Sequence, residues 1–369
     1  TGFLLSNALV SAAGPAFPAI SPFQINFDDA TVHEWTLDLQ HELRGSWLID
    51  AAYVGTRGLY LPRETDPNQA INLSVANSPA IAAACANPLT GGCPRPFPAY
   101  APFSYTESSG SSIYHALQVK AERHYSRGLA VLGSYTYSKS IDTNSNPFGT
   151  DRNENFPQNS RDLAAEKALS DFDFRHRLTF AYVYDLPVGR TMWRAANPRV
   201  NYLIEGWEVS GIFAAESGPH FTANLSGNNS GADEQQITGQ GHPTDRPNLT
   251  GGALYPANQT PDQWVLPSAF AAPAPFTFGN AGRNILAGQG LASWDFSVIR
   301  SFRLAESKHL EFRAELFNLF NRPNFDTPAR DVASPSFGKI FNTVVPEAGL
   351  ASGGPGDPRE AQLALRLIW

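Results

Sequence analysis

The last eleven residues of the chain, 359–369, alternate between two kinds of side chain. A period of two with one wholly apolar face is typical of a β-strand that has an apolar environment on one side and a more polar one on the other. A tilted strand of about 9–11 residues also crosses the hydrocarbon core of a bilayer. The segment therefore favours either a membrane-crossing strand or an amphipathic strand of a soluble sandwich. The apolar set is Ala361, Leu363, Leu365, Leu367 and the terminal Trp369.

The composition of the 369 residues favours strands and turns over helices. Aromatic residues make up 12% and charged residues 17%, with 30 glycines and 29 prolines. No apolar run approaches the ~20 residues of a transmembrane helix, but barrel strands conceal their hydrophobicity in alternation. The net charge of −7 argues against a nucleic-acid partner, which requires a basic face.

Alternation like that of the terminal segment recurs in about nine segments, each near 10–15 residues, against a mean of ~5–6 for soluble proteins. The connections between them are alternately short and long. In an antiparallel meander, every second connection lies at the same end of the sheet. The predicted segments are 31–43, 46–56, 112–125, 128–138, 175–186, 202–216, 293–303, 308–320 and 359–369.

The pattern predicts an all-β fold: an antiparallel transmembrane β-barrel portion with short periplasmic turns and long extracellular loops. The predicted long loops are 57–111, 139–174, 217–292 and 321–358. A connection as long as 217–292, without structure of its own, does not suit a compact soluble domain. The segment 337–340 is assigned to the last loop, because a further spanning strand would break the alternation.

In such a barrel the apolar alternation faces lipid and the polar one faces the lumen. Charges of alternating sign on the polar alternation suit guidance of a polar solute, pairing with a plug, or mutual ion pairing. Arg300 and His41 fall on the lipid side, near strand ends from which they can reach the interface. The predicted lumen-facing residues are Glu311, Arg313, Glu315, Gln362 and Arg366.

Aromatic residues gather near both ends of the predicted strands, as in the girdles of membrane barrels. The outer rim is expected to hold Trp35, Tyr53, Tyr137 and Trp294, and the inner rim Trp47, Tyr184, Phe302 and Trp369. Ile212 and Phe317 depart from the pattern, because they fall on the lumen side.

Cys85 and Cys93 are the two cysteines of the chain and lie in a stretch rich in proline and glycine. A structural zinc site requires four ligands, and no second pair of cysteines exists. The spacing favours a local disulfide over two free thiols. A disulfide implies an oxidising compartment, and labelling of intact, unreduced cells by a membrane-impermeant thiol reagent would contradict it.

Several motifs, taken in order, resemble the C-terminal half of TonB-dependent, Oar-like outer-membrane receptors of acidobacterial type. They are 114–120 (YHALQVK), 134–140 (SYTYSKS), 172–178 (FDFRHRL), 312–321 (FRAELFNLFN) and 358–360 (PRE). The resemblance is good over about residues 110–369 and loose before them. It implies a barrel of about twenty-two strands around a plug. It also implies coupling to TonB, uptake of a nutrient, and insertion by the barrel-assembly machinery, which recognises the terminal strand.

About nine strands is an odd number, and Thr1 opens no signal peptide. We therefore expect residues 1–369 to be the C-terminal part of an incomplete barrel. The plug domain, TonB box and signal peptide are expected to lie outside this chain. The expected location is the outer membrane of a Gram-negative bacterium, in contact with its lipid.

No catalytic motif such as a Gly-x-Ser-x-Gly elbow or a His-Glu-x-x-His helix appears, so we expect no enzyme activity, cofactor or metal. The charged segment 171–177 suits a solvated rim better than a calcium loop. The polar segment 228–234 suits a flexible loop better than a calcium or sugar site. Three functions remain: an uptake receptor for a small molecule, peptide or oligosaccharide; an adhesive or structural barrel; and a secreted carbohydrate-binding sandwich.

Overall fold

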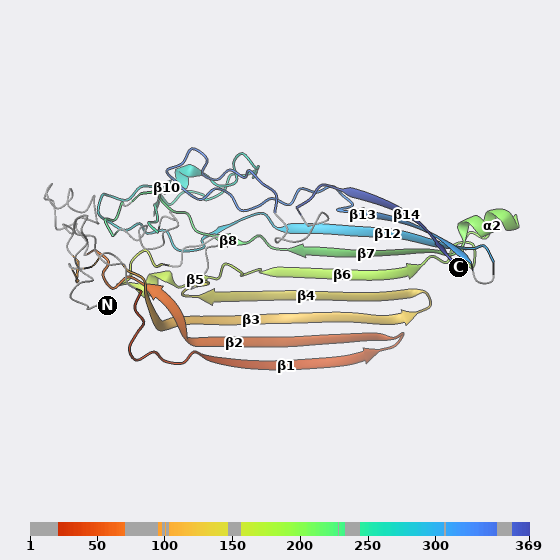
Figure 1. Ribbon diagram of the computed structural model, residues 1–369, viewed down its shortest axis with the longest axis horizontal. Helices are drawn as coiled ribbons and strands as arrows, with labels where there is room; N and C mark the ends of the chain where they lie inside the picture. The colour runs from red at the N-terminus through yellow and green to blue at the C-terminus, as the bar shows by residue number, and fades with distance from the viewer. Residues whose placement is uncertain are drawn as a thin grey trace, which may run out of the picture.

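The protein is one long, curved antiparallel sheet with a cluster of loops at one end (Figure 1). The structure is a computed structural model. It describes residues 21–70, 95–97, 100, 103–146, 156–227, 229–232, 244–305, 308–344 and 356–369.

The main sheet confirms the predicted all-β antiparallel fold. Its strands follow the order β1-β2-β3-β4-β6-β7-β12-β13-β14, so each long strand pairs with the next along the chain. The short β5 (Ala168–Leu169) adds to the end of β4. The long strands are β1 (Thr31–Leu43), β2 (Trp47–Thr65), β3 (Tyr105–Ser126), β4 (Leu129–Asp142), β6 (His176–Asp185), β7 (Trp207–Glu216), β12 (Leu291–Arg303), β13 (His309–Phe317) and β14 (Glu360–Ile368).

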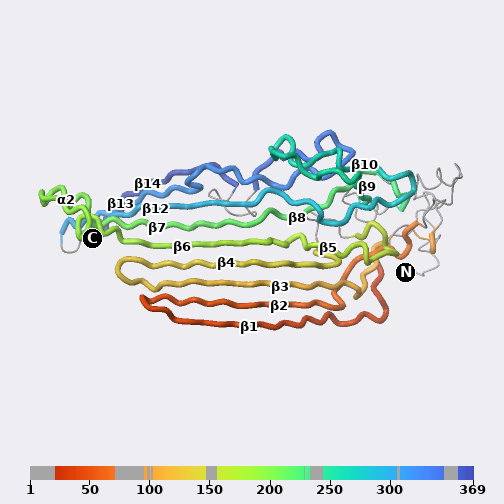
Figure 2. The backbone as a smooth tube through the Cα atoms, turned by 180° about the vertical axis from the view of Figure 1, so that it is seen from behind, coloured from red at the N-terminus to blue at the C-terminus, as the bar shows by residue number. Residues whose placement is uncertain are grey.

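Short and long connections lie at opposite ends of the sheet, as the sequence predicts. The turns β1–β2, β3–β4, β6–β7 and β12–β13 lie at the end that carries the C-terminus (Figure 1). The view from behind shows the long connections gathered at the other end (Figure 2). Among the described residues, β1 and β14 are the two edges of the sheet and do not pair with each other.

The two faces of the sheet differ as the alternation requires. On one face, leucines of separate strands are exposed: Leu37 is 63% exposed, Leu117 46% and Leu365 70%. Burial of apolar surface is worth about 25 cal/mol per Å², so an apolar face of this kind favours a nonaqueous environment. We call this the outer face.

Aromatic and histidine side chains meet on the outer face near the long-loop end. The Tyr53 hydroxyl lies 2.8 Å from His115 Nδ1, and the Tyr135 hydroxyl lies 2.8 Å from His176 Nδ1. The Trp35 indole lies on Gly55, where a Cβ would come within 2.2 Å of the ring. Glycine at this position therefore allows the ring to lie flat on the strand.

The connection between β6 and β7 contains a helix that the alternation did not predict. The strand expected over 202–216 begins at Trp207, and α2 (Pro198–Ile204) precedes it. Asn197 caps the helix by accepting a hydrogen bond from the Arg199 amide at 2.9 Å, and Pro198 occupies the first turn. Both are helix-start signals, so the boundary was mistaken because the alternation was extended across them.

Strands β2 and β3 are longer than predicted. Their pairing continues beyond residue 57 to the pair Thr65–Tyr105, through register shifts around Leu61. Tyr60 adopts a left-handed φ of 54° within this irregular stretch. Bulges interrupt the period of two, so alternation ends in the sequence before pairing ends in the structure.

The long loop 217–292 has structure of its own, which corrects the expectation of a structureless excursion. Together with the last long loop it forms a small apolar core at one end of the sheet. Phe270 and Phe337 meet there edge to face at 5.4 Å. The segment 337–340 lies in the last loop, as predicted. The buried core residues are Phe221, Ala223, Val265, Ala269, Phe270, Leu286 and Phe337.

Small elements support this core. The pairs β8 (His220–Phe221) with β11 (Leu286–Ala287), and β9 (Asn248–Leu249) with β10 (Phe270–Ala271), are antiparallel. Within the part of the chain described, these pairs are the only sheets besides the main one. A sandwich requires two sheets packed face to face, so the sandwich alternative is wrong. None of the described helices combines the length and the apolar character needed to cross a bilayer.

Candidate functional site: the inner groove and the loop assembly

A groove of about 620 Å³ crosses the face of the sheet opposite the outer face. Its lining comes from strands as far apart as β3 and β13, including Glu122 and Arg313. The sheet therefore curves over this side, and we call it the inner face. The side chains that line it are mainly those of the polar alternation.

The predicted lumen-facing residues of β13 lie on this inner face. Arg313 lies between two carboxylates, with its Nη2 3.3 Å from Glu311 Oε1 and its Nη1 3.7 Å from Glu315 Oε1. Across the β13–β14 ladder, Glu311 is opposite Arg366 and Glu315 is opposite Gln362. Arg313 is 42% exposed, and such exposed ion pairs contribute little stability, about 0–1 kcal/mol. Their polar groups remain available to a solute.

An apolar area lies beside these charges on the inner face. Leu132 is 45% exposed and Ile212 is 56% exposed, and both line the groove with Phe317. Ile212 and Phe317, which depart from the sequence pattern, thus place apolar surface next to the charged side chains of β13. A groove of this composition can contact a solute that has both polar and apolar parts.

The loops at the far end of the sheet are joined by buried ion pairs. Glu166, in η4 (Leu163–Glu166), accepts hydrogen bonds from both terminal nitrogens of Arg246, at 3.1 and 2.7 Å. The two residues are 3% and 4% exposed. This pair joins the β4–β6 loop to the β7–β12 loop.

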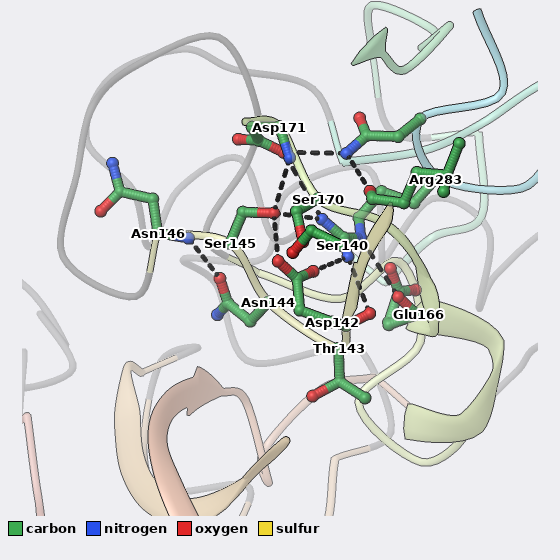
Figure 3. A network of polar contacts seen from close by, with 12 residues as sticks. Ser140, Asp142, Thr143, Asn144, Ser145, Asn146, Glu166, Ser170, Asp171 and Arg283 are labelled. Atoms are coloured by element: carbon green, nitrogen blue, oxygen red, sulfur yellow. Dashed lines mark hydrogen bonds and ion pairs between the residues drawn. The ribbon is translucent and has the colours of Figure 1, made fainter. Parts of the chain in front are cut away.

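Arg283 makes a second connection between the same loops (Figure 3). Its guanidinium pairs with Asp142 at the end of β4, and its Nη1 lies 3.0 Å from Ser145 Oγ. Its Nε donates to the Glu166 carbonyl at 3.1 Å. Arg283 and Asp142 are 8% and 2% exposed. The guanidinium therefore binds the end of a strand and a loop helix at once.

Two glutamines extend the assembly to the β2–β3 loop. Gln69 donates to the Gln158 carbonyl at 3.1 Å and accepts from the Ser160 amide at 2.9 Å. Gln158 accepts from the Arg246 amide at 2.8 Å and donates to the Gly279 carbonyl at 3.0 Å. Three long loops thus share one buried polar network, which we call the loop assembly.

Asp66 lies at the start of the β2–β3 loop and is 1% exposed. Its Oδ1 accepts from the amides of Asn68 and Phe103, at 2.8 and 3.3 Å. Its Oδ2 has no hydrogen-bond partner among the described residues. Burial raises the pKa of Asp66 to about 6, although the two amides and nearby arginines oppose the shift.

The charged segment 171–177 belongs to the same assembly. Asp173 accepts from the Ser140 amide at 2.6 Å and lies 3.5 Å from His220 Nε2. Burial acts to raise its pKa, but the bonds from His220 and Ser140 and the charge of Arg175 outweigh it and lower the pKa. Asp171 accepts from Asn284 at 2.8 Å. These carboxylates bind neighbouring loops, and the described residues contain no cluster of three or more metal-ligating side chains.

The residues of the predicted assembly signal lie on the outer face of β14. Leu363 is 74% exposed, Leu367 50% and Trp369 82%, and Ala361 and Leu365 share their side. Cys85 and Cys93 lie outside the described residues, as do residues 228, 233 and 234 of the segment 228–234. The buried arginines of the loop assembly were not predicted, because no local period marks a residue whose partners are about 80–140 positions away.

Comparison with known proteins gives a family match over nearly the whole chain. Residues 2–362 match the model described as "Outer membrane beta barrel domain". A search of curated proteins found no match.

Solved structures match most of the chain at low sequence identity and low TM-scores. The outer membrane transporter YddB from Escherichia coli has a TM-score of 0.43 at 9% identity, over 93% of this chain and 33% of that chain. The pyoverdine outer membrane receptor FpvA from Pseudomonas aeruginosa PAO1, bound to pyoverdine, has a TM-score of 0.39 at 10% identity, over 93% and 30%. The chain therefore spans about a third of the length of these structures.

Proposed function

The chain belongs to the outer membrane β-barrel domain family, and we propose on this premise that it forms part of the wall and the outer loops of an uptake receptor. The receptor takes up a nutrient across the outer membrane of a Gram-negative bacterium and is energised through TonB. The resemblance of the motifs to Oar-like receptors of acidobacterial type supports this assignment. A plug and a TonB-binding segment then belong to the complete receptor.

One observation carries the proposal: the loop assembly is held rigidly by buried ion pairs at one end of a sheet whose inner face carries a groove. Glu166 and Arg246 are nearly inaccessible to water, and the groove holds charged and apolar groups together. Rigid loops lose little conformational entropy when they bind a ligand. Such loops suit capture of a solute at the mouth, and the groove suits its contact with the wall.

The ligand is proposed to be a small molecule, peptide or oligosaccharide with polar and apolar parts. Arg313 between two carboxylates offers hydrogen-bond donors and acceptors, and Ile212 offers exposed apolar surface. This composition favours a neutral or zwitterionic solute over a strongly charged one.

The test is energised uptake by cells that produce the full-length protein. Membrane fractions are first examined for heat-modifiable migration in SDS gels, which reports a folded barrel. Uptake of pooled labelled peptides and oligosaccharides is then compared in strains with and without TonB. The proposal expects uptake that is lost without TonB and on collapse of the proton-motive force.

An adhesive or structural barrel is the competing function. It predicts a heat-modifiable protein, no TonB-dependent accumulation, and cell attachment that depends on the loops. That combination would overturn the uptake proposal while leaving the membrane barrel intact. An aqueous, detergent-free monomer would overturn both.

A further inference from the structure

The connection between β6 and β7, residues 187–206, folds onto the outer face of the sheet. Its helix α2 projects at the short-turn end, beside the C-terminus (Figure 1). Tyr202 of α2 lies 6.3 Å from the Phe302 ring and donates its hydroxyl hydrogen to the Arg303 carbonyl at 3.1 Å. Phe302 belongs to the outer, apolar alternation of β12. The helix is thus held beside the apolar face and away from the inner groove.

Arg300 fixes the helix to this face. Its guanidinium lies 5.7, 5.6 and 4.5 Å from the ring centres of Tyr202, Trp207 and Phe302, and the residue is 3% exposed. Its Nη2 donates to the Tyr202 carbonyl, whereas Nε and Nη1 have no partner among the described residues. The expectation that Arg300 extends to the interface is therefore wrong, because α2 covers it.

The helix and the turn before it expose a set of large apolar side chains. Trp193 is 78% exposed, Leu203 59%, Met192 51% and Val200 46%. The connection also has local hydrogen bonds of its own, since Asn197 caps α2 and Asn201 donates to Glu205 at 3.1 Å. Large apolar side chains exposed together on one element mark a candidate site of interaction with a protein or a membrane.

The same connection is basic. It contains three arginines and one acidic residue, Glu205, which gives a net charge of +2 (three minus one) on a chain whose net charge is −7. Arg190, Arg194 and Arg199 are all exposed, whereas Glu205 is half-buried and bound to Asn201. An element that exposes tryptophan and leucine together with arginines is typical of a membrane interface.

We propose that residues 187–206 form an interfacial anchor that binds anionic phospholipid headgroups at the short-turn side of the membrane. The inference rests on the membrane placement in the proposed function. Trp193, Val200 and Leu203 enter the boundary between headgroups and acyl chains, while the three arginines bind phosphates. Lipid is favoured over a protein partner because the apolar set is continuous with the outer face, through Tyr202 on Phe302.

The test uses the full-length protein in vesicles, with Cys85 and Cys93 replaced by serine. Leu203→Cys is labelled with an environment-sensitive fluorophore, and Arg44→Cys in the β1–β2 turn is the matched control. Vesicles contain brominated phosphatidylglycerol or brominated phosphatidylcholine at the same mole fraction. The anchor predicts strong quenching at position 203 and little at position 44, with a preference for the brominated anionic lipid.

Replacing Arg190, Arg194 and Arg199 by glutamine should remove that preference while quenching by either lipid persists. Each arginine near an anionic surface is worth about a fivefold change in binding. Arg300→Met should instead release α2 and reduce quenching by both lipids. Strong quenching by aqueous iodide at position 203 would overturn the proposal in favour of a soluble partner. The experiment does not measure uptake, so a barrel that inserts into vesicles but does not transport still tests the anchor. A protein that does not insert at all overturns both the anchor and the proposed function.

Discussion

Glu166 and Arg246, 80 residues apart in sequence, form a two-bond ion pair that is almost completely buried. Two charges removed from water remain stable only while each neutralises the other. The pair therefore makes the order of the β4–β6 loop depend on the order of the β7–β12 loop.

Replacing Glu166 by alanine should release both loops. The change leaves the Arg246 guanidinium buried without its carboxylate, which typically costs about 3–5 kcal/mol. The rate of hydrogen exchange at residues 156–166 and 244–249 should rise 100-fold or more, because a free energy of that size changes the equilibrium for opening of the loops by about that factor. The long strands should keep their protection, since their ladders do not contain the pair.

The matched control is Arg177→Gln. Arg177 Nε lies 3.5 Å from Glu216 Oε2, but the arginine side chain is 67% exposed. Removing an exposed pair should leave exchange in the loops unchanged. Equal effects of the two replacements would show that the loops are not held by the buried pair.

The strands were predictable because alternation is a local property that every spanning strand must satisfy. Strand direction and alternation put Glu311 and Arg366 on one face and Leu363 and Ala314 on the other, whereas the register that makes each pair direct neighbours is a finding of the structure. The sequence pattern did not predict helix α2, although Asn197 and Pro198 are helix-start signals, because the strand alternation was extended across the cap. In that case a local signal for the helix was present, but the apparent alternation over 202–216 was given more weight.

The loop assembly could not be predicted in the same way. Arg283 bonds the Asp142 carbonyl and carboxylate from 141 positions away, and nothing near Arg283 in sequence identifies that partner. Phe221, Val265 and Phe337 form a core without any period. Contacts of this kind are selected by how loops pack in three dimensions, so they become visible only in the structure.

Loop stability should depend on pH through Asp66. Its pKa is 3.8 in an exposed chain and about 6 here, so between those values the folded loop binds more protons than the unfolded one. The contribution of Asp66 to stability is therefore fully present below about pH 4 and is lost as the pH rises through about 6. Each pKa unit corresponds to about 1.4 kcal/mol, so the loss is on the order of 3 kcal/mol.

Hydrogen exchange of the Asn68 and Phe103 amides, corrected for intrinsic pH dependence, measures this effect. Asp66→Asn should keep both bonds to Oδ1 and place an amide where Oδ2 has no partner among the described residues. Protection should then vary much less with pH. Asp245, whose pKa burial also raises, contributes with the same sign and leaves a residual slope. A slope that Asp66→Asn does not alter would contradict the assignment.

The two faces of β14 can be compared at adjacent positions. Leu363 is on the outer face and 74% exposed, and Gln362 is on the inner face opposite Glu315. Leu363→Arg should destabilise the membrane-inserted barrel by about 2–4 kcal/mol, the cost of arginine near the bilayer midplane. Gln362→Arg should have little effect, because the inner face is polar. Urea unfolding of the full-length protein in vesicles measures both, and equal costs would show that the faces are assigned wrongly.

The role of Trp369 in assembly is separable from its role in stability. Trp369 is 82% exposed at the end of the outer alternation, where a charge costs only about 0–1 kcal/mol in the folded barrel. Trp369→Asp should therefore leave urea unfolding of the refolded protein nearly unchanged. We propose, from the family resemblance, that the barrel-assembly machinery recognises the aromatic residue that ends the outer alternation. Trp369→Asp should then reduce the heat-modifiable fraction in the outer membrane several-fold in cells. Trp369→Phe is the control and should assemble normally. Normal assembly of Trp369→Asp would remove the proposed signal, whereas a large loss of stability in vesicles would assign the residue to packing.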